Sequence, residues 1–342
     1  MGPRLATGGR LWYDFDMKRH RRIRIRPLGA LFLLIIALLL VLTVVLVVRL
    51  SGGGDTEQAG PAGTVIPDEG ANLEAETPAM PAATAEPSIM EDWYLERCGQ
   101  LRRYLTAYGG YEDEAAVEAA IEAMNIDPDG KMVAITFDDG PDPYHTPRIL
   151  ETLRQYNARA TFFVLGQQIP GNYGILEDIL GAGCEIGNHT QAHTDLRAVS
   201  AEEAREAIVS VNETLKELFD YDVKLLRPPY GSYKTDDDRI KTLARELGLS
   251  IIMWRRSTDD SLTPRPTVDQ IVERALAEWD ENGTGLNGAI ILFHDRYDET
   301  VEAIARIVPA LQEQGYQLVT VSELLQTDEG GMNPGGVYRF KG

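Results

Sequence analysis

The chain has 342 residues, of which 44% are hydrophobic, so it is long enough and apolar enough to bury a core and is not a disordered protein. It carries 53 acidic and 33 basic side chains, which give a formal net charge of −20. A charge this negative argues against the binding of nucleic acid or another polyanion, and it makes an uncharged polymer the easier partner.

The first predicted element is a membrane-spanning helix at residues 28–48, where the sequence reads LGALFLLIIALLLVLTVVLVV. This uncharged run is long enough to cross a hydrocarbon core of about 30 Å as a helix. A cleaved signal peptide has a shorter apolar segment, of about 7–15 residues, and a small-residue cleavage site, so we expect an uncleaved anchor. The basic cluster at residues 18–26 should keep the N-terminus in the cytosol, and everything after Leu50 is then expected outside the cell.

Beyond the span, the sequence predicts a disordered tether followed by a small helical collar. Residues 49–88 are rich in Gly, Pro, Ala, Thr and acidic residues and have no periodic apolar positions, as in disordered linkers. Apolar residues then recur at helical spacing over residues 89–108, and a second helical pattern covers residues 112–124. We therefore expect residues 89–130 to form a collar that packs on the main domain.

Two cysteines, Cys98 and Cys184, stand far apart in the sequence and lack the Cys-x-x-Cys spacing of metal and redox motifs. Outside the cell they could pair as a disulfide. We favour two separate buried thiols, because Cys184 lies inside the main domain and Cys98 lies in the peripheral collar.

From Lys131 onward, short apolar runs alternate with amphipathic helical patterns. The predicted strands cover residues 133–135, 160–165, 185–187, 224–226, 250–254, 289–293 and 317–320. The predicted helices cover residues 146–156, 175–182, 201–219, 236–247, 268–280 and 300–314, with Ser200 as the N-cap of the longest. Repeated strand-then-helix units predict an α/β fold with a parallel, barrel-like sheet, in which all strand carboxyl ends share one face.

The predicted organisation of the whole chain follows from these elements. It consists of a cytosolic basic tail at residues 1–27, a transmembrane anchor at 28–48, a disordered linker at 49–88, a helical collar at 89–130, a main α/β domain at 131–328 and a tail at 329–342. Only the main domain carries residue patterns that indicate chemistry.

Two adjacent carboxylates, Asp138 and Asp139, follow the first strand of the main domain in the segment KMVAITFDDGP. In barrels and open α/β sheets, groups at the carboxyl ends of strands reach a common mouth. Adjacent residues that leave a strand point in different directions, so one carboxylate can bind a cation while its neighbour faces a substrate. Asp-Asp-Gly-Pro is also ordinary turn chemistry, so the pair alone does not decide between the two interpretations.

His189 and His193 follow the predicted strand at residues 185–187. Two histidines at i and i+4 lie on one face if the stretch is helical, at a separation that suits two nitrogen ligands of one metal, although such pairs also occur by coincidence on surfaces. The chain has only five histidines, and two of them stand here. With a carboxylate from Asp138 or Asp139 they would form a three-ligand site with open positions, which is how catalytic zinc is held.

Two further segments follow predicted strands. Arg227 begins the segment RPPYG, which could simply be a rigid loop. Alternatively, this rigidity could hold the guanidinium beside a carboxylate and direct a backbone N–H near Tyr230 toward an oxyanion. His294 ends the last long apolar strand, where a lone histidine is ambiguous. Opposite an activated water, however, it would be placed to protonate a leaving group.

Together these segments resemble the polysaccharide deacetylases of carbohydrate esterase family 4, the NodB-homology domain, over about residues 131–325. The resemblance rests on four motifs in the family's order: TFDDGP at 136–141, HTQAH at 189–193, RPPY at 227–230 and LFH at 292–294. It implies a distorted (β/α) barrel as the fold of the main domain.

The resemblance also implies a role for each motif residue. Asp138 would be the general base, and Arg227 would orient it. The divalent metal, usually zinc or otherwise an ion such as Co²⁺ or Ni²⁺, would be bound by Asp139, His189 and His193. The backbone N–H of Tyr230 would serve the oxyanion, Leu292 would line the pocket for the acetyl methyl group, and His294 would be the general acid.

The sequence departs from the family pattern in one segment. The family often has Asp-x-x-Asp-Trp after a strand that ends in Trp, where the second Asp tunes the catalytic histidine and the Trp borders the groove. Here Trp254 is followed by RRSTDDS, so Ser257 replaces the first Asp, Ser261 replaces the Trp, and Asp260 alone keeps its place. The departure puts the sugar-stacking wall of the groove in doubt and removes no catalytic group.

The sequence thus predicts a membrane-anchored, metal-dependent enzyme that removes N-acetyl groups from an extracellular glycan. Given the anchor and the tether, we expect this glycan to be cell-wall peptidoglycan and the sugar to be N-acetylglucosamine. A rival hypothesis is an O-deacetylase of xylan or another acetylated polysaccharide. A rival from another class is a catalytically silent wall-binding module, against which the intact metal and acid–base set argues.

Overall fold

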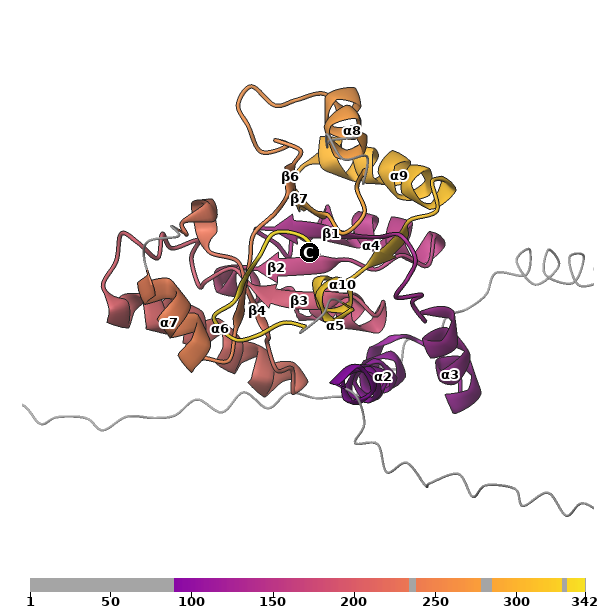
Figure 1. Cartoon of the computed structure of the whole chain (residues 1–342), viewed down its shortest axis with the longest axis horizontal. Coiled ribbons are helices and arrows are strands. Elements are labelled where there is room, and N and C mark those ends of the chain that lie inside the picture. Colours follow the sequence, from indigo (N-terminus) through magenta and orange to yellow (C-terminus); the bar gives the residue numbers. More distant parts are fainter. Residues whose placement is uncertain (1–88, 234–237, 278–284, 328–330, 342) are drawn as a thin grey trace, which may run out of the picture. The chain divides into compact units, whose positions relative to one another are not determined.

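Residues from Met132 onward build one parallel β-sheet with helices around it (Figure 1). The protein is represented by a computed structural model, which describes residues 89–233, 238–277, 285–327 and 331–341. The predicted cytosolic tail, transmembrane span and tether lie outside the described residues. Within the described part of the chain, no helix has both the length and the apolar character needed to cross a membrane.

The sheet has nine strands, and every adjacent pair among them is parallel. The strands are β1 (Met132–Asp138), β2 (Thr161–Val164), β3 (Glu185–Asn188), β4 (Leu225–Leu226), β5 (Ser250–Ile252), β6 (Arg256–Ser257), β7 (Ile290–His294), β8 (Gln317–Val319) and β9 (Val337–Tyr338). Their order is β6-β7-β1-β2-β3-β4-β5-β9, and β8 pairs with the first half of β1.

The sheet is curled into a half-barrel, which confirms the parallel, barrel-like sheet that was expected. β6 and β9 stand at the two ends of the strand order, but these ends are connected. β6 follows β5 after three residues, and Phe340, just beyond β9, forms an antiparallel bridge with Ala289, just before β7. β9 comes from the segment that was expected to be a tail, and it pairs with β5. Alternation of strands and helices predicted the parallel sheet but not the bridge from Phe340 to Ala289, since this bridge joins segments that are distant in the sequence.

The helices of the main domain agree closely with the periodicity of the sequence. They are α4 (Thr146–Gln155), α5 (Tyr173–Gly181), α6 (Ala201–Phe219), α7 (Asp238–Glu246), α8 (Val268–Leu276), α9 (Asp298–Glu313) and α10 (Val321–Gln326), with short 3₁₀ turns η1 (Gly166–Gln168) and η2 (Pro229–Gly231). Ser200 caps α6 as predicted: its Oγ accepts the N–H of Glu203, whose carboxylate accepts the N–H of Ser200 in return.

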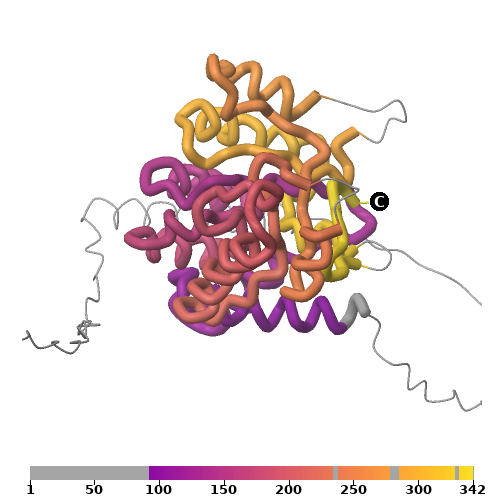
Figure 2. Tube along the Cα trace, turned by 90° about the vertical axis from the view of Figure 1, so that its left-hand side faces the viewer, coloured from indigo at the N-terminus to yellow at the C-terminus, as the bar shows by residue number. Residues whose placement is uncertain are grey.

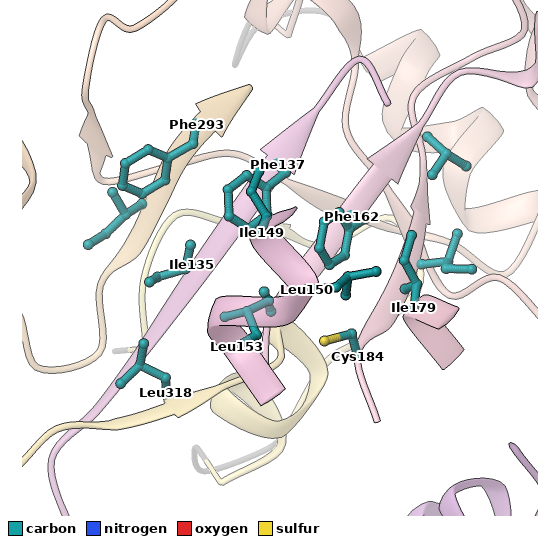
Figure 3. Close-up of a cluster of buried hydrophobic side chains, with 14 of the residues drawn as sticks. Ile135, Phe137, Ile149, Leu150, Leu153, Phe162, Ile179, Cys184, Phe293 and Leu318 are labelled. Atoms are coloured by element: carbon teal, nitrogen blue, oxygen red, sulfur yellow. The ribbon is translucent and has the colours of Figure 1, made fainter. Parts of the chain in front are cut away.

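The two faces of β1 enter two different apolar layers. All seven residues of β1 are buried, as expected for a central parallel strand. Ile135 and Phe137 point toward α4, and the ring of Phe137 stacks on that of Phe162 with centroids 5.0 Å apart (Figure 3). Thr136 and Asp138 belong to the opposite face, because side chains alternate along a strand.

The inner face of the sheet is covered by apolar side chains at the end where β1 begins and is polar at the end where β1 stops. Met132 and Ala134 of β1 pack in a second cluster with Leu324 of α10, which lies at the end where β1 begins. Asp138 stands where β1 ends. A carboxylate is thereby placed at the mouth of the half-barrel, with apolar packing beneath it.

The predicted collar consists of α2 (Ile89–Tyr108) and α3 (Glu114–Ala123), and α2 lies along one side of the main domain against α5 (Figures 1 and 2). Both cysteines are free, as expected, and Cys184 is buried in the outer layer (Figure 3). Cys98 was also expected to be buried, but it is only half-buried where it packs in the collar.

A buried ion cluster fixes α2 to the main domain. Nε of Arg97 donates to Glu323 Oε1 at 2.6 Å, and Nε of Arg159 donates to Oε2 of the same carboxylate at 2.9 Å. Burial alone would raise the pKa of Glu323, but the charges of Arg159 and Arg97 hold that pKa below its usual value. The cluster is stable only while the carboxylate is present between the two guanidinium groups.

Glu323→Ala is therefore expected to lower the free energy of unfolding by about 3–5 kcal/mol, because it leaves two buried guanidinium groups without a counter-charge. The matched control is Glu118→Ala, which breaks an exposed pair between Glu118 and Arg102 and should have a much smaller effect. Urea unfolding of both variants measures the difference. Equal stability of the two variants would contradict a role for Glu323 in holding the collar.

Candidate active site

The predicted site residues converge at the carboxyl ends of four strands. Asp138 ends β1 and His294 ends β7, and the two residues are direct partners in the register of these strands. Asn188 ends β3 and pairs with Leu226 of β4, so the segments that follow these two strands also start side by side. The structure therefore brings together at one edge the motifs that the sequence places up to about 150 residues apart.

Arg227 is a fully buried cation at the centre of this edge. Its Nη1 donates to Asp138 Oδ1 at 2.7 Å and to Thr136 Oγ1 at 2.8 Å. Nε and Nη2 donate to the backbone carbonyls of Ile252 and Met253 at 3.1 and 3.2 Å. The arginine thus ties the end of β4 to β1 and β5, in addition to contacting the carboxylate.

The contact with Arg227 keeps Asp138 ionised. Burial alone would raise the pKa of Asp138, but the positive charge of Arg227, with smaller effects of His189 and His294, lowers the pKa below its usual value. The side chain of Asp138 is nevertheless buried. An ionised carboxylate in a dry site is a proton acceptor that is available at neutral pH.

Asp139, His189 and His193 form a group that fits a metal ion. One ligand atom from each of the three lies within 4.8 Å of the other two. His189 Nε2 is 3.6 Å and His193 Nε2 is 3.4 Å from Asp139 Oδ1, and this oxygen is buried without a hydrogen-bond donor. A buried carboxylate oxygen that faces two imidazole nitrogens, with no hydrogen-bond donor among the described residues, is a donor set that could hold a divalent metal ion.

The orientation of His189 also suits a metal ligand. Its Nδ1–H donates to the carbonyl oxygen of Arg227 at 2.7 Å, which leaves the Nε2 lone pair directed at the group. Burial lowers the pKa of His189 more than the nearby carboxylates raise it, so the ring is held neutral, the form that binds metals.

The two histidines do not meet by way of a helical turn, which corrects the expectation from their spacing. Residues 189–193 form a loop in which Thr190 and His193 have positive φ, at 70° and 56°. The Oδ1 of Asn188 accepts the N–H of Thr190 at 2.7 Å and stabilises this turn. Local side-chain hydrogen bonds, rather than helical periodicity, therefore set the separation of the ligands.

His294 is positioned by Asp260, the residue that was expected to tune it. Nδ1–H of His294 donates to Asp260 Oδ1 at 2.8 Å, and the backbone N–H of His294 donates to Oδ2 at 2.8 Å. Burial lowers the pKa of His294, but the hydrogen bond and charge of Asp260 outweigh this and raise the pKa to about 9. The imidazole is therefore a cation at neutral pH, with Nε2 left free to donate a proton.

The two predicted substrate contacts also lie at this edge. Leu292 is buried on the same face of β7 as His294 and is the register partner of Thr136. Tyr230 has a positive φ of 61°, its side chain is 69% exposed, and its ring centroid lies 4.4 Å from that of His193. At the departure from the family pattern, Ser257 contacts Asp259 and Ser261 is exposed, so no aromatic ring stands at that position.

Three polar residues that the sequence analysis assigned no role support the site. Thr136 accepts from Arg227 and donates to the carbonyl of Ile291, and Thr300 donates to Asp260 Oδ2 at 2.7 Å. Asp295 is buried, accepts a hydrogen bond from Thr146, and has a pKa raised by burial to about 7. Asp295 directly follows His294 and Thr136 opens the TFDDGP motif, positions that could have drawn attention to both, whereas no sequence signal distinguishes Thr300.

Comparisons with known proteins agree with this geometry. Residues 125–252 match the family model described as polysaccharide deacetylase. The chain is 39% identical to a peptidoglycan-N-acetylglucosamine deacetylase of Bacillus cereus over 57% of this chain and 89% of that protein. It is 34% identical to the peptidoglycan-N-acetylmuramic acid deacetylase PdaC of Bacillus subtilis over 58% of this chain, but it spans only 40% of the length of PdaC.

Solved structures show the same likeness. The structure of PdaC from B. subtilis superposes with a TM-score of 0.53 at 35% identity, over 59% of this chain and 93% of that one. The Xyl-CE4 domain of a multidomain xylanase from the hindgut metagenome of Trinervitermes trinervoides superposes with a TM-score of 0.54 at 30% identity, over 62% of this chain and 98% of that one.

His189→Ala and His193→Ala are each expected to lower the zinc that the purified chain retains, because each removes one of three ligands. His145→Ala is the matched control, since His145 contacts Asp142 and lies outside the three-residue group. Metal analysis after incubation with zinc and desalting gives the comparison. The assignment of the ligands is wrong if both variants retain as much zinc as the parent chain and the control.

Proposed function

The chain belongs to the polysaccharide deacetylase family, carbohydrate esterase family 4, and is a hydrolase that acts on amide bonds; we propose that its reaction is the metal-dependent removal of N-acetyl groups from peptidoglycan N-acetylglucosamine, with release of acetate. One observation carries the proposal. An anionic base, Asp138, and a cationic acid, His294, are register partners on adjoining strands and border one metal-binding group.

The residues divide the reaction between them. Asp138, ionised through Arg227, accepts a proton from the attacking water. His294, protonated through Asp260, donates a proton to the departing amine. A divalent metal held by Asp139, His189 and His193 would supply positive charge that acidifies water and polarises the acetamide carbonyl. The backbone N–H of Tyr230 would stabilise the oxyanion, and Leu292 would contact the acetyl methyl group.

The choice of substrate rests on the relatives. Two of the similar proteins carry peptidoglycan in their names, one as an N-acetylglucosamine deacetylase and one as an N-acetylmuramic acid deacetylase. A second candidate function, O-deacetylation of xylan, is supported by the likeness to a domain of a multidomain xylanase. Peptidoglycan is preferred because the first of these relatives shares the higher identity, 39% against 30%.

We further propose that the catalytic domain acts outside the cell on a membrane anchor. The support for this location is the apolar run at residues 28–48, the basic cluster that precedes it and the linker that follows. A linker of about 40 residues would let a tethered domain reach a cell-wall polymer while staying attached.

Acetate release tests the proposed function. The purified chain, loaded with zinc, is incubated with peptidoglycan, with chitin oligomers and with acetylated xylan. Release from peptidoglycan in excess of that from xylan is expected. Release from xylan alone would replace the proposal by O-deacetylation, and release from none of the three would support a wall-binding module.

The two adjacent aspartates should respond differently to the same substitution. Asp138→Asn keeps the metal group intact but removes the proton acceptor, so it should retain zinc and lose turnover. Asp139→Asn removes a ligand, so it should lose zinc affinity as well. Zinc content and acetate release are measured on both variants, and the reverse pattern would exchange the two roles.

The activity should depend on pH through both proton-transfer groups. Asp138 has a lowered pKa and must be ionised, so activity falls as the pH drops through that pKa; His294 has a pKa of about 9 and must be protonated, so activity also falls as the pH rises through it. The profile of kcat/KM is therefore bell-shaped. Asp260→Asn should move the alkaline limb to lower pH with unchanged zinc content, because it removes the carboxylate that raises the pKa of His294.

His294→Ala should lower kcat by about 10²–10⁴-fold and flatten the alkaline limb, since a positioned acid contributes about that factor. An alkaline limb that persists in His294→Ala would assign it to another group. An unshifted limb in Asp260→Asn would show that Asp260 does not tune the acid.

A further inference from the structure

Arg296 stands at the rim of the site, in the short connection between β7 and α9. It follows His294 by two residues, and its Nη1 lies 4.0 Å from Asp139 Oδ2, so the guanidinium reaches the mouth of the site. Its side chain is 43% exposed, whereas that of Arg227 is fully buried. Arg227 therefore contacts only groups inside the site, whereas Arg296 is accessible to a ligand that enters from solution.

Among the described residues, Arg296 has no carboxylate within hydrogen-bond distance. Asp298, the first residue of α9, is paired with Arg148 at 2.5 Å. Of the residues that the structure describes, Asp139 alone has a carboxylate within 4.0 Å of the Arg296 guanidinium, and Oδ1 of Asp139 faces the two candidate ligand histidines. Once Asp139 binds a metal, its negative charge is shared with a divalent cation and no longer neutralises Arg296.

The backbone on both sides of Arg296 is held in place. The preceding residue, Asp295, is buried and accepts a hydrogen bond from Thr146. The following residue, Tyr297, has the guanidinium of Arg265 stacked 3.7 Å above its ring. Arg296 thus projects from a fixed position, which reduces the conformational entropy that is lost when it binds a ligand.

We propose that Arg296 binds a carboxylate on the sugar next to the N-acetyl group that is hydrolysed, and so selects acidic glycans over neutral ones. This inference rests on the proposed function. A guanidinium presents parallel N–H donors that match a carboxylate, and it keeps its charge at every relevant pH. In peptidoglycan the matching group is the lactyl carboxylate of the neighbouring N-acetylmuramic acid, which is free only where the stem peptide has been removed, since the peptide is otherwise joined to it as an amide. We therefore expect a preference for peptide-free glycan strands.

The overall charge of the chain makes a local cation necessary for such a substrate. At a net charge of −20 the protein as a whole repels an acidic polymer. A single exposed guanidinium beside the reacting group provides a local site of opposite charge without making the surface basic. The expectation of an uncharged partner, which followed from total charge, is thereby revised at this one position.

A different role for Arg296 would be to orient Asp139 as a metal ligand. The geometry favours the substrate role, because 4.0 Å is beyond hydrogen-bond distance and the exposed side chain is screened by water, in contrast to the 2.7 Å contact of Arg227 with Asp138. The two roles predict different results, since a residue that orients a ligand affects zinc binding and all substrates alike.

The experiment compares two soluble substrates on the zinc-loaded chain. One is a glycan oligomer of alternating N-acetylglucosamine and N-acetylmuramic acid with free lactyl carboxylates, and the other is the same oligomer with these carboxylates converted to methyl amides. The parent chain, Arg296→Gln, Arg296→Lys and the control Arg306→Gln are assayed for kcat/KM by acetate release. Arg306 pairs with Asp269 between α8 and α9, so its variant makes the same charge change away from the rim.

The parent chain and Arg306→Gln should prefer the carboxylate oligomer, and Arg296→Gln should reduce that preference roughly tenfold, the factor that corresponds to one charged hydrogen-bonding pair. Arg296→Lys should retain part of it, because the charge remains but the parallel donors are lost. An undiminished preference in Arg296→Gln overturns the proposal. So does an equal fall on both oligomers together with lost zinc, which would assign Arg296 to the orientation of Asp139.

Calorimetric binding of both oligomers separates this inference from the proposed function. If the parent chain releases no acetate from either oligomer, the proposed function fails, and the inference is then judged by binding alone. A preference for the carboxylate oligomer that disappears in Arg296→Gln supports the inference, and equal affinity of the parent chain for both oligomers overturns it.

Discussion

The burial of one guanidinium group, that of Arg227, is the constraint on which the site depends. A cation without solvent is unstable unless its charge is balanced and its N–H groups are bonded. The chain meets both conditions by collecting acceptors from two strands and the residue that follows one of them: Asp138 and Thr136 of β1, the carbonyl of Ile252 at the end of β5, and that of Met253 just beyond it. The ring of Phe163 lies 4.0 Å below the guanidinium and adds a cation–π contact. Because Asp138 supplies the charge that balances Arg227, burial of this arginine requires an ionised carboxylate at the mouth of the half-barrel.

The same arginine links the base to the metal group. Its side chain holds Asp138, and its backbone carbonyl accepts Nδ1–H of His189, so one residue fixes both the proton acceptor and the direction of a candidate metal ligand. On the other side, Asp260 performs the opposite electrostatic task and keeps His294 protonated. The pKa of Asp138 is lowered and that of His294 is raised by their surroundings. At neutral pH the first group is therefore ionised and the second protonated, so they can act as base and acid in one reaction.

The sequence predicted those parts of the structure that depend on local pattern. The strand and helix positions followed from apolar periodicity, and the motif residues were located because each follows a strand whose carboxyl end must face the same edge. The two-residue strands β6 and β9 were not predicted, because Arg256-Ser257 and Val337-Tyr338 have no apolar run of their own and pair only through tertiary contact. The loop of His189 and His193 was expected as a possible helix, since spacing does not reveal that Asn188 caps a turn with positive φ. Arg296 belongs to no motif, and only its distance from Asp139 identified it.

We propose that one metal ion, held by Asp139, His189 and His193, and the acid–base pair beside it act as one catalytic unit. The most direct measurement is a titration of the metal-stripped chain with zinc in which acetate release from peptidoglycan is followed against bound metal. If the metal and the acid–base pair act together, the stripped chain is inactive, and the rate rises in proportion to bound zinc until one ion is bound per chain. Acetate release by the stripped chain, or a full complement of zinc with no acetate release, would contradict this proposal.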